Sequence, residues 1–545
     1  MNKRACAVPL AMAMAVSAAA FPITGYFQRY RGPAVRVRNI EGVRERVSDG
    51  KLHLRLKDFL ELVLANNTEI NITRLDVMNA ASSVIAAHAP YDPNITAGFT
   101  SVRTVSPSFT QIAGAETLQS LSQFSQVGVT QTLPSGQSVN LGFNASRDST
   151  NNRFQFFNPS IFTGLNFSVT QPLLRDRGSL QLRAPLQIAR SRLLIISEQS
   201  EARIGDMVTA AARQYWDAIE ARENIRVQQQ SLDLAQKSNE RDQMALDLGA
   251  LPKLDIFQSQ SQVAQRKVGL IQAQYAYRDA IDRLRQLIGA DLVSETRDAE
   301  IVLEDDPAGV PVLSPLVPFE EALAGAMRKR PELTSARRLT SIDELNARVA
   351  KDSMLPRLDL RGLAGGSGLG GNQVPISGPR GTGPSQFIAG GVGDALGQLF
   401  RFGAPFYGFG LQLTIPTRSS TAQASLTDAL VSKARDQYQQ RQIEQQVIQE
   451  VKLATNQLEM AGSQIEAARI ARDLSQKNVE AEQQKYELGG ITAFEVLEAQ
   501  NRLTAVESTL VSAYTGYQKA VINYRRAIWT LLDDMGVVVE TPQIK

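Results

Sequence analysis

Two acidic residues follow a glycine turn near the C-terminus, and their spacing would let both carboxylates act at one place. Glu495 and Glu498 come six and nine residues after Gly489, and because they are three positions apart they share one face of a helix. Asp255 stands at the position equivalent to Glu495 in an earlier copy of the same turn, where Gln258 replaces the second acid. Carboxylates that converge around a pore attract cations. Most glutamate pairs, however, simply form a solvated helix face.

Other chemistries find no support in the sequence. It has no GxxxxGK[ST] phosphate loop. His53 and His88 are the only histidines, and neither has the spaced partners of a metal site or the context of a catalytic triad. The sequence therefore predicts no catalytic residue, no metal ligand, no cofactor and no enzyme. A net charge of +3 in 545 residues gives no argument for nucleic-acid binding.

The glycine turn belongs to an internal duplication. LDLGALPKLDIFQSQ (246–260) aligns without a gap with YELGGITAFEVLEAQ (486–500), at an offset of 240. A second correspondence, at an offset of 263, links the starts of the two halves and places Pro93 over Pro356. Each half therefore repeats one order of elements, with insertions between the matched parts.

Helical periodicity fills most of both halves. Ile256 begins a series of apolar residues seven apart, and Val496 begins its counterpart beside a seam of small residues. Such repeats predict long helices that pack against partners as coiled coils. We expect a first helix, a very long helix of roughly 90–100 Å and a last helix in each half, at 57–89, 184–246 and 253–288 and again at 319–353, 420–487 and 493–532.

Alternating stretches between the helices predict β-strands. Residues 163–171 and 407–415 alternate apolar with small or polar residues, as in a membrane-barrel strand or a half-buried strand of a soluble sheet. Weaker versions lie at 93–101 and 356–362. A further pair of strands, 126–134 and 137–146, reads as a hairpin that either lengthens an outer loop or joins the barrel. The Gly-rich residues 363–405 read as a mobile loop.

The N-terminus reads as a secretory signal, with Lys3 and Arg4 before an apolar stretch and Ala18–Ala20 as a small-residue cleavage site. The alternative is an apolar leader or an anchor helix. The only cysteine, Cys6, lies in this segment, so no disulfide framework is expected. The predicted segments are a signal peptide (1–20), an N-terminal segment (21–56), the first repeat (57–290), a connector (291–318), the second repeat (319–533) and a tail (534–545).

These features together resemble the TolC family of outer-membrane factors, from about residue 52 to 533. The resemblance rests on the duplication, the helix–strand–helix order, the QPLL sequence at 171–174 and the paired tips. It implies an α+β membrane protein. In it, three protomers each give about four core strands to one transmembrane β-barrel, which a long periplasmic α-helical barrel continues. A lone protomer could not close either barrel, and open strand edges are not tolerated in lipid.

The resemblance also implies roles for the tips. Glu495, Glu498, Asp255 and Tyr486 would form the pore constriction. The helix–turn–helix tips would dock a periplasmic adaptor through Leu248, Gly249, Ala250, Leu251, Leu488, Gly489, Gly490 and Ile491. One position departs from the family, since Ile491 stands where a basic residue ties neighbouring tips together. Lys485 or Lys253 would have to take over that contact.

The implied function is the outer-membrane exit duct of a tripartite efflux pump or a type I secretion system. Its partners would be two further copies of the chain, a periplasmic adaptor, an inner-membrane pump and outer-membrane lipid. One alternative is a non-conducting envelope protein built as a coiled-coil rod, which the alternating strands disfavour. Another is a diffusion porin or an adhesin, but porins lack long heptad helices.

Overall fold

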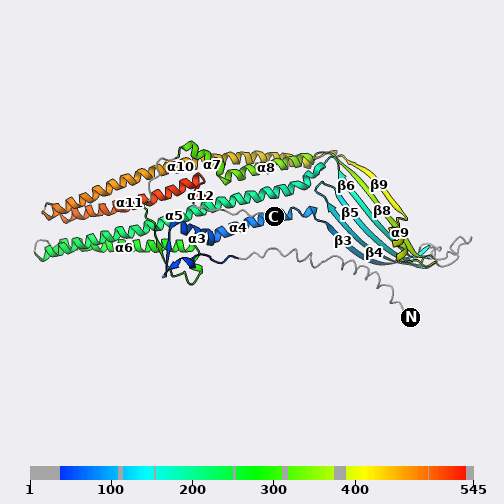
Figure 1. Ribbon diagram of the computed structural model, residues 1–545, viewed down its shortest axis with the longest axis horizontal. Coiled ribbons are helices and arrows are strands. Elements are labelled where there is room, and N and C mark those ends of the chain that lie inside the picture. The colour runs from blue at the N-terminus through cyan, green and yellow to red at the C-terminus, as the bar shows by residue number, and fades with distance from the viewer. Residues whose placement is uncertain are drawn as a thin grey trace, which may run out of the picture.

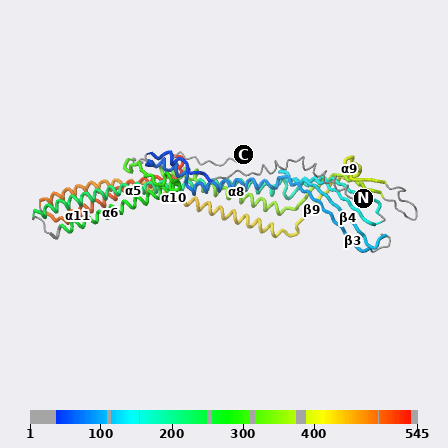
Figure 2. The backbone as a smooth tube through the Cα atoms, turned by 90° about the horizontal axis from the view of Figure 1, so that it is seen from below, coloured from blue at the N-terminus to red at the C-terminus, as the bar shows by residue number. Residues whose placement is uncertain are grey.

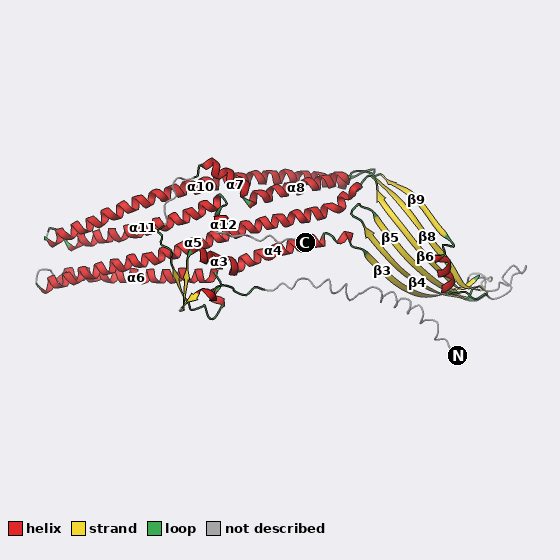
Figure 3. Ribbon diagram, viewed as in Figure 1, coloured by secondary structure: helices red, strands yellow, loops and turns green. Residues whose placement is uncertain are grey.

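The chain is long and thin, with helices at one end and a single large sheet at the other (Figures 1 and 3). The computed structural model describes residues 37–48, 50–108, 114–152, 155–248, 253–309, 317–373, 388–488 and 490–534. The predicted signal peptide and most of the predicted tail fall outside these ranges. Among the described helices, none combines the length and the apolar character needed to cross a membrane.

Four helices form two hairpins that run side by side (Figure 1). Helix α5 (Leu180–Asp247) and helix α10 (Ser420–Glu487) each contain 68 residues. Their return partners, α6 (Lys253–Leu287) and α11 (Ala493–Ala527), each contain 35. The predicted long helices and last helices are confirmed, although the last helix of the second half ends earlier and is followed by the short α12 (Leu531–Asp534).

The first helix of each half is interrupted, so the prediction of one unbroken helix is wrong in both. The pieces are α3 (Leu56–Asn66) and α4 (Thr68–Ala86), and α7 (Phe319–Lys329) and α8 (Pro331–Asp352). Asn67 leaves the helical conformation, and its side chain accepts hydrogen bonds from the N–H groups of Glu69 and Ile70 as the cap of α4. Pro331 holds the preceding Arg330 in an extended conformation in the same way.

The heptad positions are core positions. Ile256, Leu270 and Leu284 of α6 are buried, as are Val496, Leu503 and Tyr517 of α11. Two large apolar clusters result, one centred on α5 and one on α10 with α11. Figure 2 shows from a second side that both hairpins keep together along their length.

The large sheet contains six antiparallel strands in the order β3-β4-β5-β6-β8-β9. The strands predicted at 93–101, 163–171, 356–362 and 407–415 fall in four of these. The hairpin, whose place the sequence left open, supplies the other two and stands between β3 and β6. The bounds are β3 (Asn94–Pro107), β4 (Thr117–Thr132), β5 (Ser138–Thr150), β6 (Phe157–Pro172), β8 (Arg357–Gln373) and β9 (Pro405–Thr414).

The prediction of a mobile loop at 363–405 is wrong over its described parts. Strand β8 continues to Gln373, and residues 392–400 form helix α9 (Val392–Phe400), which packs on β8 and β6. The glycines of β8 make room for that helix, because a Cβ on Gly368 would lie 1.9 Å from the Ala395 carbonyl oxygen. Thr163 of β6 fixes the contact by donating to the same oxygen at 3.2 Å.

A small sheet joins two segments far apart in the chain. It contains β1 (Val47–Ser48), β2 (Lys51–Leu54) and β7 (Glu300–Leu303), the last of which lies in the predicted connector. The buried Tyr215 of α5 ties this sheet to the long helix. Its hydroxyl lies 2.7 Å from Asp305 Oδ2, and the same oxygen accepts from the Leu56 N–H that begins α3.

Candidate gate and docking tips

Both helical hairpins turn at the end of the molecule farthest from the sheet (Figure 1). The two long helices end in the same way, with the Leu248 N–H donating to Met244 and the Leu488 N–H to Gln484. Leu248 is 84% exposed and Leu488 is 87% exposed. The structure thus leaves one large apolar side chain on each tip in contact with solvent. Gly490 is also exposed and Ile491 is half-buried, whereas Gly249, Ala250, Leu251 and Gly489 lie outside the described residues.

Tyr486 connects the two hairpins near their tips. Its hydroxyl donates to Asp242 Oδ1 of α5 at 3.3 Å. The Arg241 guanidinium carbon lies 4.7 Å from the centre of the Tyr486 ring. Asp242 is only 3% exposed, so its carboxyl group lies in a nearly closed position between the helices. This contact joins the first half of the chain to the second.

The two predicted acids have partners within their own helix. Glu495 forms a capping box with Thr492, whose N–H donates to Glu495 Oε2 at 3.2 Å. Glu498 lies 3.6 Å from Arg502 Nη2, one turn further on. Both glutamates are exposed. Glu495 therefore caps the start of helix α11, and Glu498 has a weak surface ion pair. The side chain of Asp255 lies outside the described residues.

A line of polar contacts runs along α5 and α11 between the two halves. Ser231 and Thr504, both buried, have their hydroxyl oxygens 3.0 Å apart. Further from the tip, Lys519 donates to Glu220 at 2.8 Å and also contacts Asp217. We call these contacts, together with Asn224–Ser508 and Arg526–Asp206, the interhelical polar seam.

The charges of the seam stabilise one another. Burial raises the pKa of the Glu220 carboxyl, but the hydrogen bond and positive charge of Lys519, together with hydrogen bonds from Thr515 and Ser512, outweigh burial, and the net pKa is lowered. Burial lowers the pKa of Lys519, but its bonds to Asp217 and Glu220 outweigh that effect, and its net pKa is raised. Both groups are therefore charged at neutral pH. A polar seam is a better sliding surface than an apolar core, because water can replace its contacts when the helices part.

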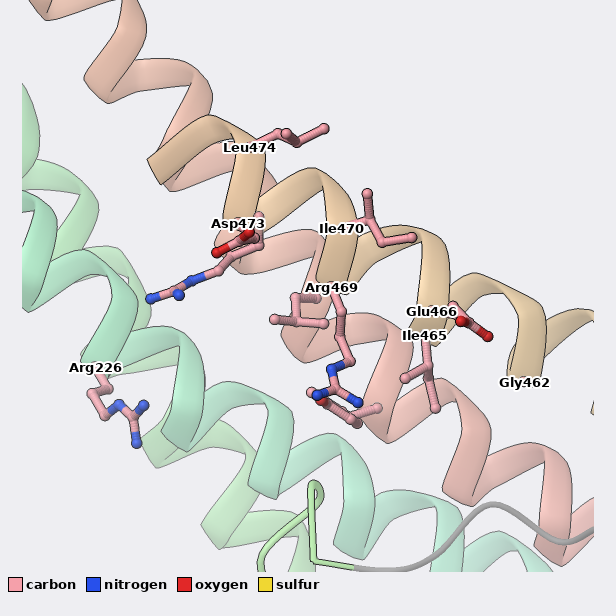
Figure 4. Close-up of a pocket in the computed structure, with 11 residues that line it drawn as sticks. Arg226, Gly462, Ile465, Glu466, Arg469, Ile470, Asp473 and Leu474 are labelled. Atoms are coloured by element: carbon pink, nitrogen blue, oxygen red, sulfur yellow. The ribbon is translucent and has the colours of Figure 1, made fainter. Parts of the chain in front are cut away.

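A cavity lies beside the seam, between α5, α10 and α11 (Figure 4). It holds about 950 Å³ and is open to solvent. Arg226 borders it from α5, and Arg469 and Arg472 border it from α10. Its lining includes no histidine, cysteine or serine, so it carries no nucleophile–base pair. No cluster of three metal-ligating side chains occurs among the described residues.

Sequence reasoning found Tyr486 but missed Asp242 and Arg241. A usable signal existed, because Asp242 aligns with Glu482 at the offset of 240 and so marks a repeated acid before each tip. The two acids differ in the structure. Glu482 only accepts from Lys485 of its own helix at 3.0 Å, while Asp242 is buried against the other hairpin. Lys485 was one of the two lysines expected to tie neighbouring tips together. In the structure its ion pair with Glu482 lies within its own helix.

Comparison with known proteins identifies the class. The outer membrane efflux protein family matches residues 122–290 and 323–528, which together make up more than half of the chain. The chain belongs to this family, and the solved structures similar to it are TolC-family channels. It is thus a channel-type transport protein of the outer membrane that extends into the periplasm, and its family is not one of enzymes. Among curated proteins, none matches the chain in sequence.

Solved structures share the fold. The chain is similar to a membrane protein from Pseudomonas aeruginosa, with 18% identity, a TM-score of 0.62 and coverage of 92% of this chain and 98% of that one. It is similar to the CmeC outer membrane channel of Campylobacter jejuni, with 14% identity, a TM-score of 0.58 and coverage of 92% and 94%. It is also similar to the open state of the Neisseria gonorrhoeae MtrE outer membrane channel, with 16% identity, a TM-score of 0.57 and coverage of 91% of this chain and 97% of that one.

Proposed function

We propose that this protein is the outer-membrane exit duct of a tripartite efflux pump or a type I secretion system. It acts as a passive trimeric channel. The observation that carries the proposal is the union of one apolar-faced sheet with helices of 68 residues, about 100 Å long. The sheet crosses the outer membrane, and the helices reach through the periplasm toward an inner-membrane pump. The pump supplies the energy in this proposal, since the sequence of the duct contains no GxxxxGK[ST] phosphate loop.

The trimer is supported by what one protomer leaves uncovered. Strands β3 and β9 are the two edges of the large sheet, and each lacks a neighbour on one side within the described structure. Helix α4 leads into β3 and exposes Ile72, Leu75, Met78 and Ile85, and α10 follows β9 and exposes Leu430, Val431 and Tyr438. One protomer's β9 and α10 can therefore cover the next protomer's β3 and α4 together. That closes the ring without an open strand edge in lipid.

The tips serve as gate and docking site. The Asp242–Tyr486 contact holds the two hairpins of a protomer together at the narrow end. In a trimer, Glu495 and Glu498 form acidic rings there, with Asp255 as the first-half counterpart. The exposed Leu248 and Leu488 are suitable contacts for a periplasmic adaptor. Docking opens the duct by an iris-like movement of the tip helices along the interhelical polar seam.

The alternative, a non-conducting coiled-coil protein of the envelope, predicts a sheet with a covered apolar face. In this chain Ile95, Leu141, Phe167, Tyr407 and Phe409 are all more than 40% exposed, which favours a lipid-facing sheet. Family membership favours the same function.

The proposal is tested by conductance. The mature protein, purified from outer membranes, is placed in planar lipid bilayers and compared with Glu495→Gln/Glu498→Gln, which keeps side-chain shape and hydrogen bonding. We expect small cation-selective openings in the wild type and reduced cation selectivity in the variant. Conductance with unchanged selectivity would remove these two residues from the gate. A folded protein that never inserts or conducts would refute the duct itself.

A further inference from the structure

The hairpin of β4 and β5 has the dimensions of a membrane-spanning element. The two strands contain 16 and 13 residues, and a barrel strand needs about 10 to cross a bilayer. Both pair along nearly their whole lengths, β4 with β3 on one side and β5 with β6 on the other. A loop outside the barrel would not need to pair with β3 and β6 over such lengths.

The apolar face of the hairpin continues the apolar face of its neighbours. One register row crosses all six strands and contains only apolar residues: Ile95, Val129, Leu141, Phe167, Ala364 and Tyr407. Because side chains alternate between faces, a shift of one residue in either hairpin strand would break this row. The hairpin is thus in register with the surface that faces lipid in the proposed duct.

The opposite face of the hairpin is mostly polar, and a hydrogen bond joins it to the same face of β6. Asn140 of β5 donates to Thr130 of β4 at 3.2 Å, and Asn166 of β6 donates to Asn144 of β5 at 3.4 Å. Gln126 of β4 lies in the same register row as Asn144. An aqueous lumen suits these side chains, and a lipid environment does not.

The turn of the hairpin is fixed at the start of the helical part. The Pro134 carbonyl oxygen accepts from Ser179 Oγ at 2.6 Å and from Arg183 Nη2 at 2.7 Å, at the place where α5 begins. Gly136 has φ +87°, and a Cβ there would lie 3.2 Å from the Ser179 Cβ, so the turn packs closely. The hairpin therefore spans the sheet from its outer end to its junction with the helices.

We propose that β4 and β5 are two additional lumen-lining strands in the barrel wall of every protomer. Each protomer then contributes six strands instead of the four that the family resemblance implies, and three protomers enclose eighteen (three times six). The inference rests on the proposed trimeric duct. Barrel diameter grows roughly in proportion to strand number, so the outlet is about 1.5-fold wider than with four strands each. The membrane part then offers a wide and mostly polar passage for hydrophilic cargo.

Spin-label accessibility tests this placement residue by residue in the full-length protein in lipid bilayers. Single cysteines replace Val127 and Leu141 on the apolar face of the hairpin, and Gln126 and Asn140 on its polar face, in a Cys6→Ser background. Phe167 and Asn166 of β6 are the matched controls. Relaxation is measured with oxygen, which concentrates in lipid, and with a water-soluble nickel chelate.

We expect labels at 127 and 141 to behave as at 167, and labels at 126 and 140 as at 166. Water access at all four hairpin positions, with alternation retained in β6, would overturn the inference and leave the duct intact. Loss of alternation in β6 as well would overturn the membrane barrel itself.

A second variant measures the width. Residues 108–156 are replaced by a short turn, which allows β3 to pair directly with β6, since both strands keep their apolar residues in the same register row. The distances between Asn166→Cys spin labels of the three protomers should shrink to about two-thirds of the wild-type distances. Unchanged distances would mean that the hairpin stands outside the ring, which would overturn the inference.

Discussion

The two halves of this chain agree in their helices and disagree in their strands. The long helices are equal at 68 residues and the return helices are equal at 35. The first half, however, gives four strands to the large sheet and the second gives two. Helices that lie side by side must end at one level for their tips to meet, so their lengths are tied together. An antiparallel hairpin returns the chain to the end of the sheet from which it started, so a pair of strands can be inserted without reversing the strands that follow, and the sheet becomes wider.

The largest effect should come from breaking the helical core. Val451 of α10 is completely buried in the cluster with α11, and Val451→Asp would place an unpaired carboxylate there. We expect a loss of about 4 kcal/mol or more and little folded protein in the membrane. The matched control is Leu453→Asp, two residues on and half exposed. Thermal unfolding that is equal for both variants would contradict the assigned helix face.

The interhelical polar seam should come next. Lys519→Met removes the partner of Glu220 and Asp217, and we expect a loss of about 2 kcal/mol at neutral pH because Lys519 and Glu220 are half-buried. Lys477→Met, which breaks an exposed pair with Asp473, should cost at most about 0.5 kcal/mol. Denaturant unfolding measures both.

The same variant should lose its effect in acid. The folded-state pKa of Glu220 is lowered, so its contribution is present above the ordinary carboxyl pKa and disappears as the pH falls through the lowered value. The difference in the free energy of unfolding between wild type and Lys519→Met should therefore narrow on acidification. A difference that grows in acid would mean that Glu220 is not held by Lys519.

The glycines of β8 allow a smaller and more local test. Gly368→Ala would push its Cβ against the Ala395 carbonyl, whereas Gly362→Ala, on the same face of the strand, meets nothing within 4 Å. We expect a cost of about 1–3 kcal/mol and faster proteolysis within α9 for the first variant only. Equal protease sensitivity of the two variants would show that α9 does not depend on close packing against β8.

Tyr486→Phe should have the smallest effect on stability and a clear effect on the channel. The variant keeps the ring over Arg241 and removes the hydroxyl bonded to the buried Asp242, at a cost of about 1 kcal/mol. If this contact helps to hold the tips closed, wide openings become more frequent in planar bilayers. Tyr438→Phe, an exposed tyrosine of the same helix, is the control.

Regular features were predictable from sequence and single contacts were not. The heptads from Ile256 and Val496 and the constant offset of 240 defined the helical hairpins, because both signals repeat many times. The packing of α9 on β8 was not predicted, since glycines such as Gly368 are typical of loops unless the helix that covers them is known. Asp242 was missed because its burial depends on the neighbouring hairpin. The pairing of β2 with β7 joins segments roughly 250 residues apart and has no local signal.

The central claim is that the duct opens when the hairpins of the two halves part along the polar seam. It is tested most directly with Ser231→Cys/Thr504→Cys, because the two hydroxyl oxygens are 3.0 Å apart and the replacing sulfurs can form a disulfide. The pair is placed in the Tyr486→Phe background and studied in planar bilayers. We predict that oxidation abolishes the wide openings and that a reductant restores them. Wide openings that persist in fully cross-linked protein would contradict the claim.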